Sequence, residues 1–165
     1  MMITQLMYGV IAGILATLAM DIGGTLARIA GVTAPMSPRL TGKWMAYVLR
    51  GQLRHSDIAT SPEVPVPMPL VGVAHYVIGI VLALAYLTLL NTFSVQSEHF
   101  WLAVLYGIVT TIFPWFLLFP AMGYGPFGVK APPEHRLLHS SLVNHTIYGI
   151  GLGLSIITFG PSIFY

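Results

Sequence analysis

Long apolar runs alternate with short polar segments along this chain. Four runs carry almost no charged side chains, and they cover approximately residues 3–29, 70–90, 100–122 and 139–160. Each is near or above the ~20 residues that an α-helix needs to cross a hydrocarbon layer of ~30 Å. The pattern therefore predicts an all-α membrane protein. We expect residues 1–165 to form a single membrane domain, with four transmembrane helices in an up-down bundle.

The first apolar run has some features of a secretory signal peptide. However, it lacks a basic segment before the apolar stretch, which is longer than the usual ~7–15 residues. No convincing cleavage site of small residues follows it. We therefore expect residues 3–29 to be retained as the first membrane helix.

The composition agrees with the apolar pattern. Of the 165 residues, 56% are hydrophobic and 7% are charged, whereas a soluble domain has roughly a quarter charged residues. Seven Lys and Arg residues are too few for a nucleic-acid-binding face. Cysteine is absent, which excludes disulfides and thiolate metal sites. The partner that the composition indicates is the lipid bilayer.

The positions of the basic residues predict the orientation. They all lie at the end of the first run or in the segments after the first and third runs: Arg28, Arg39, Lys43, Arg50, Arg54, Lys130 and Arg136. Because Lys and Arg concentrate in cytoplasmic loops, residues 30–69 and 123–138 are predicted to be cytoplasmic. With four helices, both termini are then outside.

The first of these loops has structure of its own. Leu40, Trp44, Tyr47 and Val48 share one helical face, and the basic residues Lys43, Arg50 and Arg54 fall on another. This predicts a short amphipathic helix at the membrane interface. The proline-rich segment 61–69 follows it and should be extended, because prolines at this density do not form a helix.

Small residues and one proline predict how the helices pack. Small side chains four residues apart let helix backbones approach closely, and such pairs are Gly9 with Gly13, Gly79 with Ala83, and Gly149 with Gly153. Pro114 lies inside the third run and should kink that helix, because proline removes a backbone donor.

A few polar residues inside the predicted helices are candidates for a site. An ionised carboxylate within a membrane costs at least ~2.5–3.5 kcal/mol, so Asp21 should face the interior, find a partner or take up a proton. His75 and His145 begin the second and fourth helices on the side where the first helix ends. The topology therefore brings all three to a similar depth. Arg28 is an alternative partner for Asp21, and Tyr148 shares the face of His145.

This group of residues allows three interpretations. It is a structural network that fixes helix register, a site for a polar ligand or ion, or a metal or haem site. His135 and His139 are spaced as two imidazoles on one helical face, with Glu134 beside them and His55 in the other loop as weaker metal candidates. His75 and His145 are candidates to ligate haem from two sides.

The chain resembles an uncharacterised family of bacterial inner-membrane proteins, domain of unknown function 2938. The stretches that carry the resemblance are GKW at 42–44, RGQLRHSDI at 50–58, AHYVIG at 74–79, PAMG at 120–123 and HSSLVNHTIYG at 139–149. With the region of Asp21, the resemblance spans almost the whole chain. It implies a small multi-spanning protein of the bacterial inner membrane, and it includes Asp21, His55, His75 and His145.

Motifs of common enzymes are missing. The sequence contains no phosphate-binding glycine loop, no G-x-S-x-G and no H-E-x-x-H, so we assign no catalytic residues and expect no catalytic activity of its own. We expect a cytoplasm-facing Asp/His site that binds or transports a small polar ligand or ion. The alternatives are a metal- or haem-binding subunit of a redox enzyme and an accessory subunit of a larger membrane complex. Whether the chain forms a homo-oligomer is left open.

Overall fold

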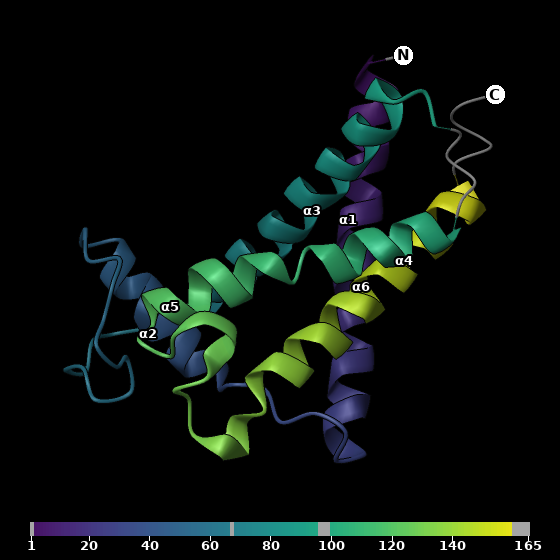
Figure 1. Cartoon of the computed structure of the whole chain (residues 1–165). Coiled ribbons are helices and arrows are strands. Elements are labelled where there is room, and N and C mark those ends of the chain that lie inside the picture. Colours follow the sequence, from purple (N-terminus) through teal and green to yellow (C-terminus); the bar gives the residue numbers. More distant parts are fainter. Residues whose placement is uncertain (1, 67, 96–99, 160–165) are drawn as a thin grey trace. The chain divides into compact units, whose positions relative to one another are not determined.

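The computed structural model describes residues 2–66, 68–95 and 100–159. Within these ranges the chain is helical and has no β-strand (Figure 1). The α-helices are α1 (Met2–Ile29), α2 (Pro38–Val48), α3 (Met68–Thr92), α4 (Phe100–Val109), α5 (Phe119–Ala121) and α6 (Leu137–Phe159). A π-helix, η1 (Pro114–Leu118), and two 3-10 helices, η2 (Pro126–Gly128) and η3 (Pro133–His135), lie between them.

Four helical stretches in the described ranges are long and apolar enough to cross a membrane. They are Ile3–Ile29, Met68–Thr92, Phe100–Ala121 and Pro133–Phe159. The prediction of four long apolar helices in an all-α protein is therefore confirmed. The second and fourth begin a few residues earlier than the sequence suggested, and residue 160 of the fourth predicted run lies outside the described residues.

The chain divides into two compact units, and each long helix contributes to both. The first unit comprises residues 1–26, 75–110 and 143–165, and the second comprises 27–74 and 111–142. Every Lys and Arg of the sequence falls within the second unit. The two units therefore differ in chemistry as well as in packing.

The first unit has an apolar core formed by α1, α3, α4 and α6. Its buried members are more often small or aromatic residues than large aliphatic ones: Tyr8, Ala12, Ala16, Ala83, Tyr86, Leu90, Ala103, Tyr148, Leu152 and Ile156. The Tyr8 hydroxyl on α1 donates a 3.3 Å hydrogen bond to the backbone oxygen of Ser155 on α6. Lipid tails are as apolar as these side chains, so burying apolar surface does not by itself drive helices together in a membrane. Close packing and hydrogen bonds of this kind stabilise the helix contacts instead.

Glycines mark the closest helix contacts of this unit. A Cβ atom added to Gly107 of α4 would lie 2.5 Å from the backbone oxygen of His145, and one added to Gly149 of α6 would lie 2.8 Å from that of Ala103. A Cβ on Gly13 would similarly meet the backbone of Ile80. The pairs α4–α6 and α1–α3, adjacent in Figure 1 as well, therefore touch through backbone atoms.

The second unit packs α2 and the two long loops around aromatic residues. Helix α2 begins after Ser37, whose side-chain oxygen accepts a 3.3 Å hydrogen bond from the Arg39 backbone N–H, and Pro38 occupies the first helical position. The loops are joined by backbone hydrogen bonds from His55 and Ile58 to the oxygens of Ala121 and Met122, each 2.9 Å long. Residues 62–66 form neither helix nor strand. The predicted extended segment 61–69 is wrong at its end, because Met68 and Pro69 already belong to the first turn of α3, where proline is tolerated.

The region around Pro114 departs from regular α-helix, as predicted. Helix α4 ends at Val109, and π-helix η1 begins at Pro114. The missing N–H of Pro114 accounts for the local change in hydrogen bonding.

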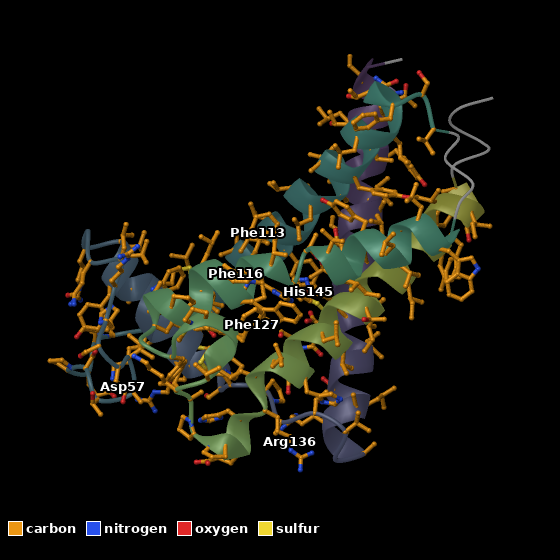
Figure 2. All side chains as sticks on the ribbon, viewed as in Figure 1. Asp57, Phe113, Phe116, Phe127, Arg136 and His145 are labelled. Atoms are coloured by element: carbon orange, nitrogen blue, oxygen red, sulfur yellow. The ribbon has the colours of Figure 1, made fainter. Side chains whose placement is uncertain are left out.

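Further along the chain, Phe127 has a positive φ of 58°. Its ring lies 4.9 Å from that of Phe116, centroid to centroid (Figure 2).

The structure corrects the predicted surface position of Lys43. Its side chain is 2% exposed and lies on the buried face of α2 with Gly42, Ala46 and Tyr47. The ammonium group donates to the backbone oxygens of Ala59 (3.4 Å) and Ser61 (2.6 Å), so hydrogen bonds to the following loop compensate for its burial. Arg50 lies beyond the end of α2 and is exposed.

Candidate functional site

Asp21 of α1 binds two consecutive residues of α3 in the first unit. One carboxylate oxygen, Oδ1, lies 3.0 Å from His75 Nε2, and the other, Oδ2, accepts a 3.0 Å hydrogen bond from the Tyr76 hydroxyl. Adjacent residues of a helix point in directions about 100° apart, so His75 and Tyr76 approach the carboxylate from two sides. The Asp21–His75–Tyr76 site therefore engages both carboxylate oxygens.

This site lies at the surface of the unit. The side chain of Asp21 is 43% exposed and that of His75 is 40% exposed. Of the three alternatives predicted for Asp21, it therefore does not take the first, which was to face the interior. The last buried residue of α1 is Thr17, whose hydroxyl donates a 2.7 Å hydrogen bond to the Gly13 oxygen. Asp21 has instead found the partner that the sequence predicted.

His145 of α6 does not bind the Asp21 carboxylate directly. Its Nδ1 lies 2.7 Å from the hydroxyl oxygen of Thr110, which in turn donates a 2.6 Å hydrogen bond to the Gly107 backbone oxygen. Because the hydroxyl has a single proton, its bond to Nδ1 uses an oxygen lone pair. His145, labelled in Figure 2, is therefore oriented by the end of α4.

Two further polar groups of α6 approach α1 and α3. The Tyr148 hydroxyl donates a 2.6 Å hydrogen bond to the backbone oxygen of Gly79, one turn after His75. Asn144 Oδ1 is buried without a hydrogen-bond partner among the described residues. A Cβ on Gly24, three residues after Asp21, would lie 2.8 Å from that oxygen. Asn144 Oδ1 therefore packs against α1 at Gly24.

The remaining candidates lie in the second unit. His55 Nδ1 is 3.2 Å from the Ser61 hydroxyl, and its buried Nε2 has no hydrogen-bond partner among the described residues. Arg28 occupies the last turn of α1. Across the described part of the chain, no three His, Cys, Asp or Glu side chains are arranged to hold a metal ion.

The predicted face of His135 and His139 is not formed. Glu134 and His135 belong to η3, Arg136 adopts a left-handed conformation with φ of 38°, and α6 begins only at Leu137. The two imidazoles are therefore not four residues apart on one continuous helix. The helical spacing that favoured a metal at this position is therefore not present in the structure.

Sequence reasoning did not identify three residues of this region. Tyr76, Thr110 and Asn144 are each polar groups inside apolar runs, next to or facing the histidines. Tyr76 and Asn144 could have been found from the sequence, because each is a polar residue directly next to a candidate histidine, His75 or His145. Thr110 gave no comparable signal, because a threonine in a membrane helix ordinarily bonds to its own backbone.

Over the residues that the structure describes, these features define an all-helical protein with four apolar helices of membrane-spanning length and a polar site on two of them. The chain belongs to the family described as "Protein of unknown function (DUF2938)", whose model matches residues 10–158. This confirms the resemblance noted in the sequence. No curated protein and no solved structure matches the chain.

Proposed function

We propose that this protein binds and transports a small cation, a proton or a cationic polar ligand at the Asp21–His75–Tyr76 site. The observation that carries the proposal is that the exposed Asp21 carboxylate has fewer hydrogen-bond partners than it can accept. Each oxygen of Asp21 engages one partner, at 3.0 Å in both cases, yet a carboxylate offers about four lone-pair positions. Because the side chain is 43% exposed, the remaining positions are accessible to a ligand.

The chemistry of the pair supports a charge change of one unit. With neutral His75 and ionised Asp21, the site carries one negative charge. A bound proton or monovalent cation would neutralise this charge. An uncompensated charge in a membrane is costly, so the bound cation or proton would stabilise the site.

The same proposal includes the membrane topology. All Lys and Arg residues belong to the second unit, which supports a cytoplasmic location for residues 30–69 and 123–138 in the bacterial inner membrane. Both termini are then outside, and the four helices form an up-down bundle. Helix α2 lies at the cytoplasmic interface.

Flux in proteoliposomes tests the transport proposal. Purified protein is reconstituted with a pH-sensitive dye inside the vesicles, and proton uptake is measured with and without gradients of Na⁺ or K⁺. We expect Asp21→Asn to abolish the flux, because asparagine preserves the size of the side chain and removes the charge. Asp57→Asn, in a loop of the second unit, serves as the matched control and should retain it.

The purely structural interpretation gives a different result. If the site only fixes helix register, Asp21→Asn lowers thermal stability in detergent and leaves every flux at the wild-type level. Absence of flux and of cation binding by the wild-type protein would also contradict the proposal.

The metal or haem subunit and the accessory subunit remain predictions. A visible absorption spectrum and elemental analysis of the purified protein test the first. A stoichiometric partner that co-purifies from native membranes would support the second.

A further inference from the structure

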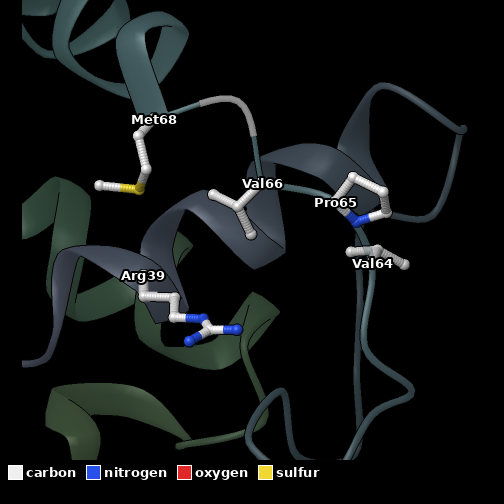
Figure 3. A pocket seen from close by; sticks show the side chains of 5 residues that line it. All are labelled: Arg39, Val64, Pro65, Val66 and Met68. Carbon is white, nitrogen blue, oxygen red and sulfur yellow. The ribbon is translucent and has the colours of Figure 1, made fainter.

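An open groove in the second unit combines apolar walls with one cation. It is lined by Arg39 of α2, by Val64, Pro65 and Val66 of the extended segment, and by Met68, the first residue of α3 (Figure 3). Val66 packs against α2 at Gly42, where a Cβ atom would lie 2.8 Å from Val71 Cγ2 and would also collide with Val66. Because Gly42 has no side chain, Val66, which forms part of the apolar wall of the groove, can pack directly against α2.

Arg39 beside this groove has only a weak anionic partner, because it shares Glu63 with Lys43. Glu63 is shared between two basic residues: its Oε1 accepts a 3.1 Å hydrogen bond from Lys43 Nζ, and its Oε2 lies 3.8 Å from Arg39. Lys43 is fixed by burial, whereas the side chains of Arg39 and Glu63 are 76% and 69% exposed. The long, exposed contact is weak, so Arg39 can exchange it for another anion while Glu63 keeps Lys43.

The surroundings of Arg39 favour an anion further. The first turn of α2 contains no acidic residue, so the partial positive charge of the helix N-terminus is not compensated within the helix. Arg39 and Lys43 against Glu63 give a net charge of +1 for this group.

The position of the groove points to a lipid as the source of the anion. Met68, 46% exposed, begins an apolar helix of membrane-spanning length. A groove at the start of such a helix lies where lipid headgroups meet acyl chains. One end offers a guanidinium to a phosphate, and the valine, proline and methionine walls match an acyl chain.

We propose that this groove binds an anionic phospholipid, with its phosphate on Arg39 and the upper part of an acyl chain against Val66 and Met68. The site is separate from Asp21 and does not depend on the transport proposal. An arginine suits a phosphate because its planar group donates two parallel hydrogen bonds.

Native mass spectrometry of the full chain in detergent tests this proposal. The protein is incubated with an equimolar mixture of phosphatidylglycerol and phosphatidylcholine, and retained lipid is quantified. We expect selective retention of phosphatidylglycerol, reduced about fivefold by Arg39→Gln, the effect typical of one cation at a membrane surface. Arg50→Gln makes the same charge change beyond the end of α2 and should retain the selectivity.

Two further arms identify the source of the anion. Met68→Gln keeps the side-chain length but removes part of the apolar wall, and it should weaken phosphatidylglycerol retention without affecting Arg39. Inorganic phosphate or glycerol phosphate should not displace the lipid at comparable concentration. Displacement by either, equal losses in the Arg39 and Arg50 variants, or unchanged retention in Arg39→Gln would overturn the proposal. Size-exclusion profiles confirm that each variant is folded.

Discussion

The hydroxyl of Tyr148 on α6 donates a 2.6 Å hydrogen bond to the backbone oxygen of Gly79 on α3. Tyr148 is 2% exposed, so water does not compete for this bond. Gly79 also allows α1 to approach α3 closely, because it has no side chain: an added Cβ atom would collide with the hydroxyl of Thr17 on α1. Three helices of the first unit therefore meet around one backbone carbonyl.

Removing this hydroxyl should destabilise the first unit. Hydrogen bonds between membrane helices contribute about 0.6 kcal/mol on average and up to about 1.7 kcal/mol. For Tyr148→Phe we expect a loss near the upper value, measured as the free energy of unfolding in mixed micelles. Thr88→Val is the control, since the Thr88 hydroxyl bonds within its own helix to Leu84. Equal effects of both substitutions would contradict the interpretation.

The backbone contact between α4 and α6 should not tolerate a methyl group. Gly107→Ala introduces a Cβ atom 2.5 Å from the His145 oxygen and 2.7 Å from Gly149 Cα. Overpacking of this kind typically costs about 1–3 kcal/mol, which a thermal unfolding scan in detergent would detect. Gly72→Ala is the matched control because nothing lies within 4 Å of its Cβ position. It should be neutral or stabilising, as alanine favours helix more than glycine.

The bond to Thr110 predicts the tautomer of His145. The Thr110 proton goes to the Gly107 oxygen at 2.6 Å, so the hydroxyl oxygen accepts from His145 Nδ1–H. In the neutral ring the proton then resides on Nδ1 and the lone pair on Nε2. The nitrogen chemical shifts of labelled His145 would report this directly. A protonated Nε2 with a bare Nδ1 would contradict it, and Thr110→Val should remove the preference.

Lys43 should be more important for stability than the exposed lysine of the chain. Its ammonium donates to Ser61 at 2.6 Å and to Glu63 at 3.1 Å, and hydrogen bonds to charged groups each contribute about 1.5–3 kcal/mol. Lys43→Met should destabilise the second unit by an amount in this range and increase proteolysis within residues 52–66. Lys130→Met, at an exposed position, should do neither. Similar digestion of the two variants would refute the role given to Lys43.

Tyr124 predicts a dependence on alkaline pH. Burial, and then the negative charge of Asp57, raises the pKa of the Tyr124 phenol. A raised pKa in the folded state stabilises the fold fully below the unfolded value of about 10. This contribution is lost as the pH rises through the folded pKa. Tyr124→Phe should therefore show a smaller loss of stability above about pH 10. Parallel unfolding curves of the two proteins across that range would be inconsistent with this account.

The long helices could be predicted because membrane thickness imposes their length. The Asp21–His75 contact could also be anticipated, since a carboxylate in an apolar helix needs a partner and the two residues occur at corresponding ends of neighbouring helices. The burial of Lys43 could not be predicted from helical periodicity. It depends on the backbone of Ala59 and Ser61 folding back over α2, a tertiary arrangement that the pattern of α2 does not contain.

Local backbone conformation explains the other differences. His135 and His139 have helical spacing in the sequence, but the left-handed Arg136 separates them. A non-glycine residue in that conformation is uncommon, so the spacing alone favoured a continuous helix. The last buried residue of α1 is Thr17, so Asp21, four residues later, lies at the surface. The apolar run in the sequence does not show where the buried part of the helix ends.

The hydrogen bond between Tyr8 and Ser155 has a consequence for how the protein is made. The two residues are 147 positions apart. At ~5–20 residues per second, a ribosome takes about 7–30 s to synthesise the chain between them. During that interval α1 has emerged while its partner α6 does not yet exist, so the face carrying Tyr8 and Ala16 must be covered by lipid or by the insertion machinery. The first unit therefore closes only as a late step of biogenesis, after the last helix has entered the membrane.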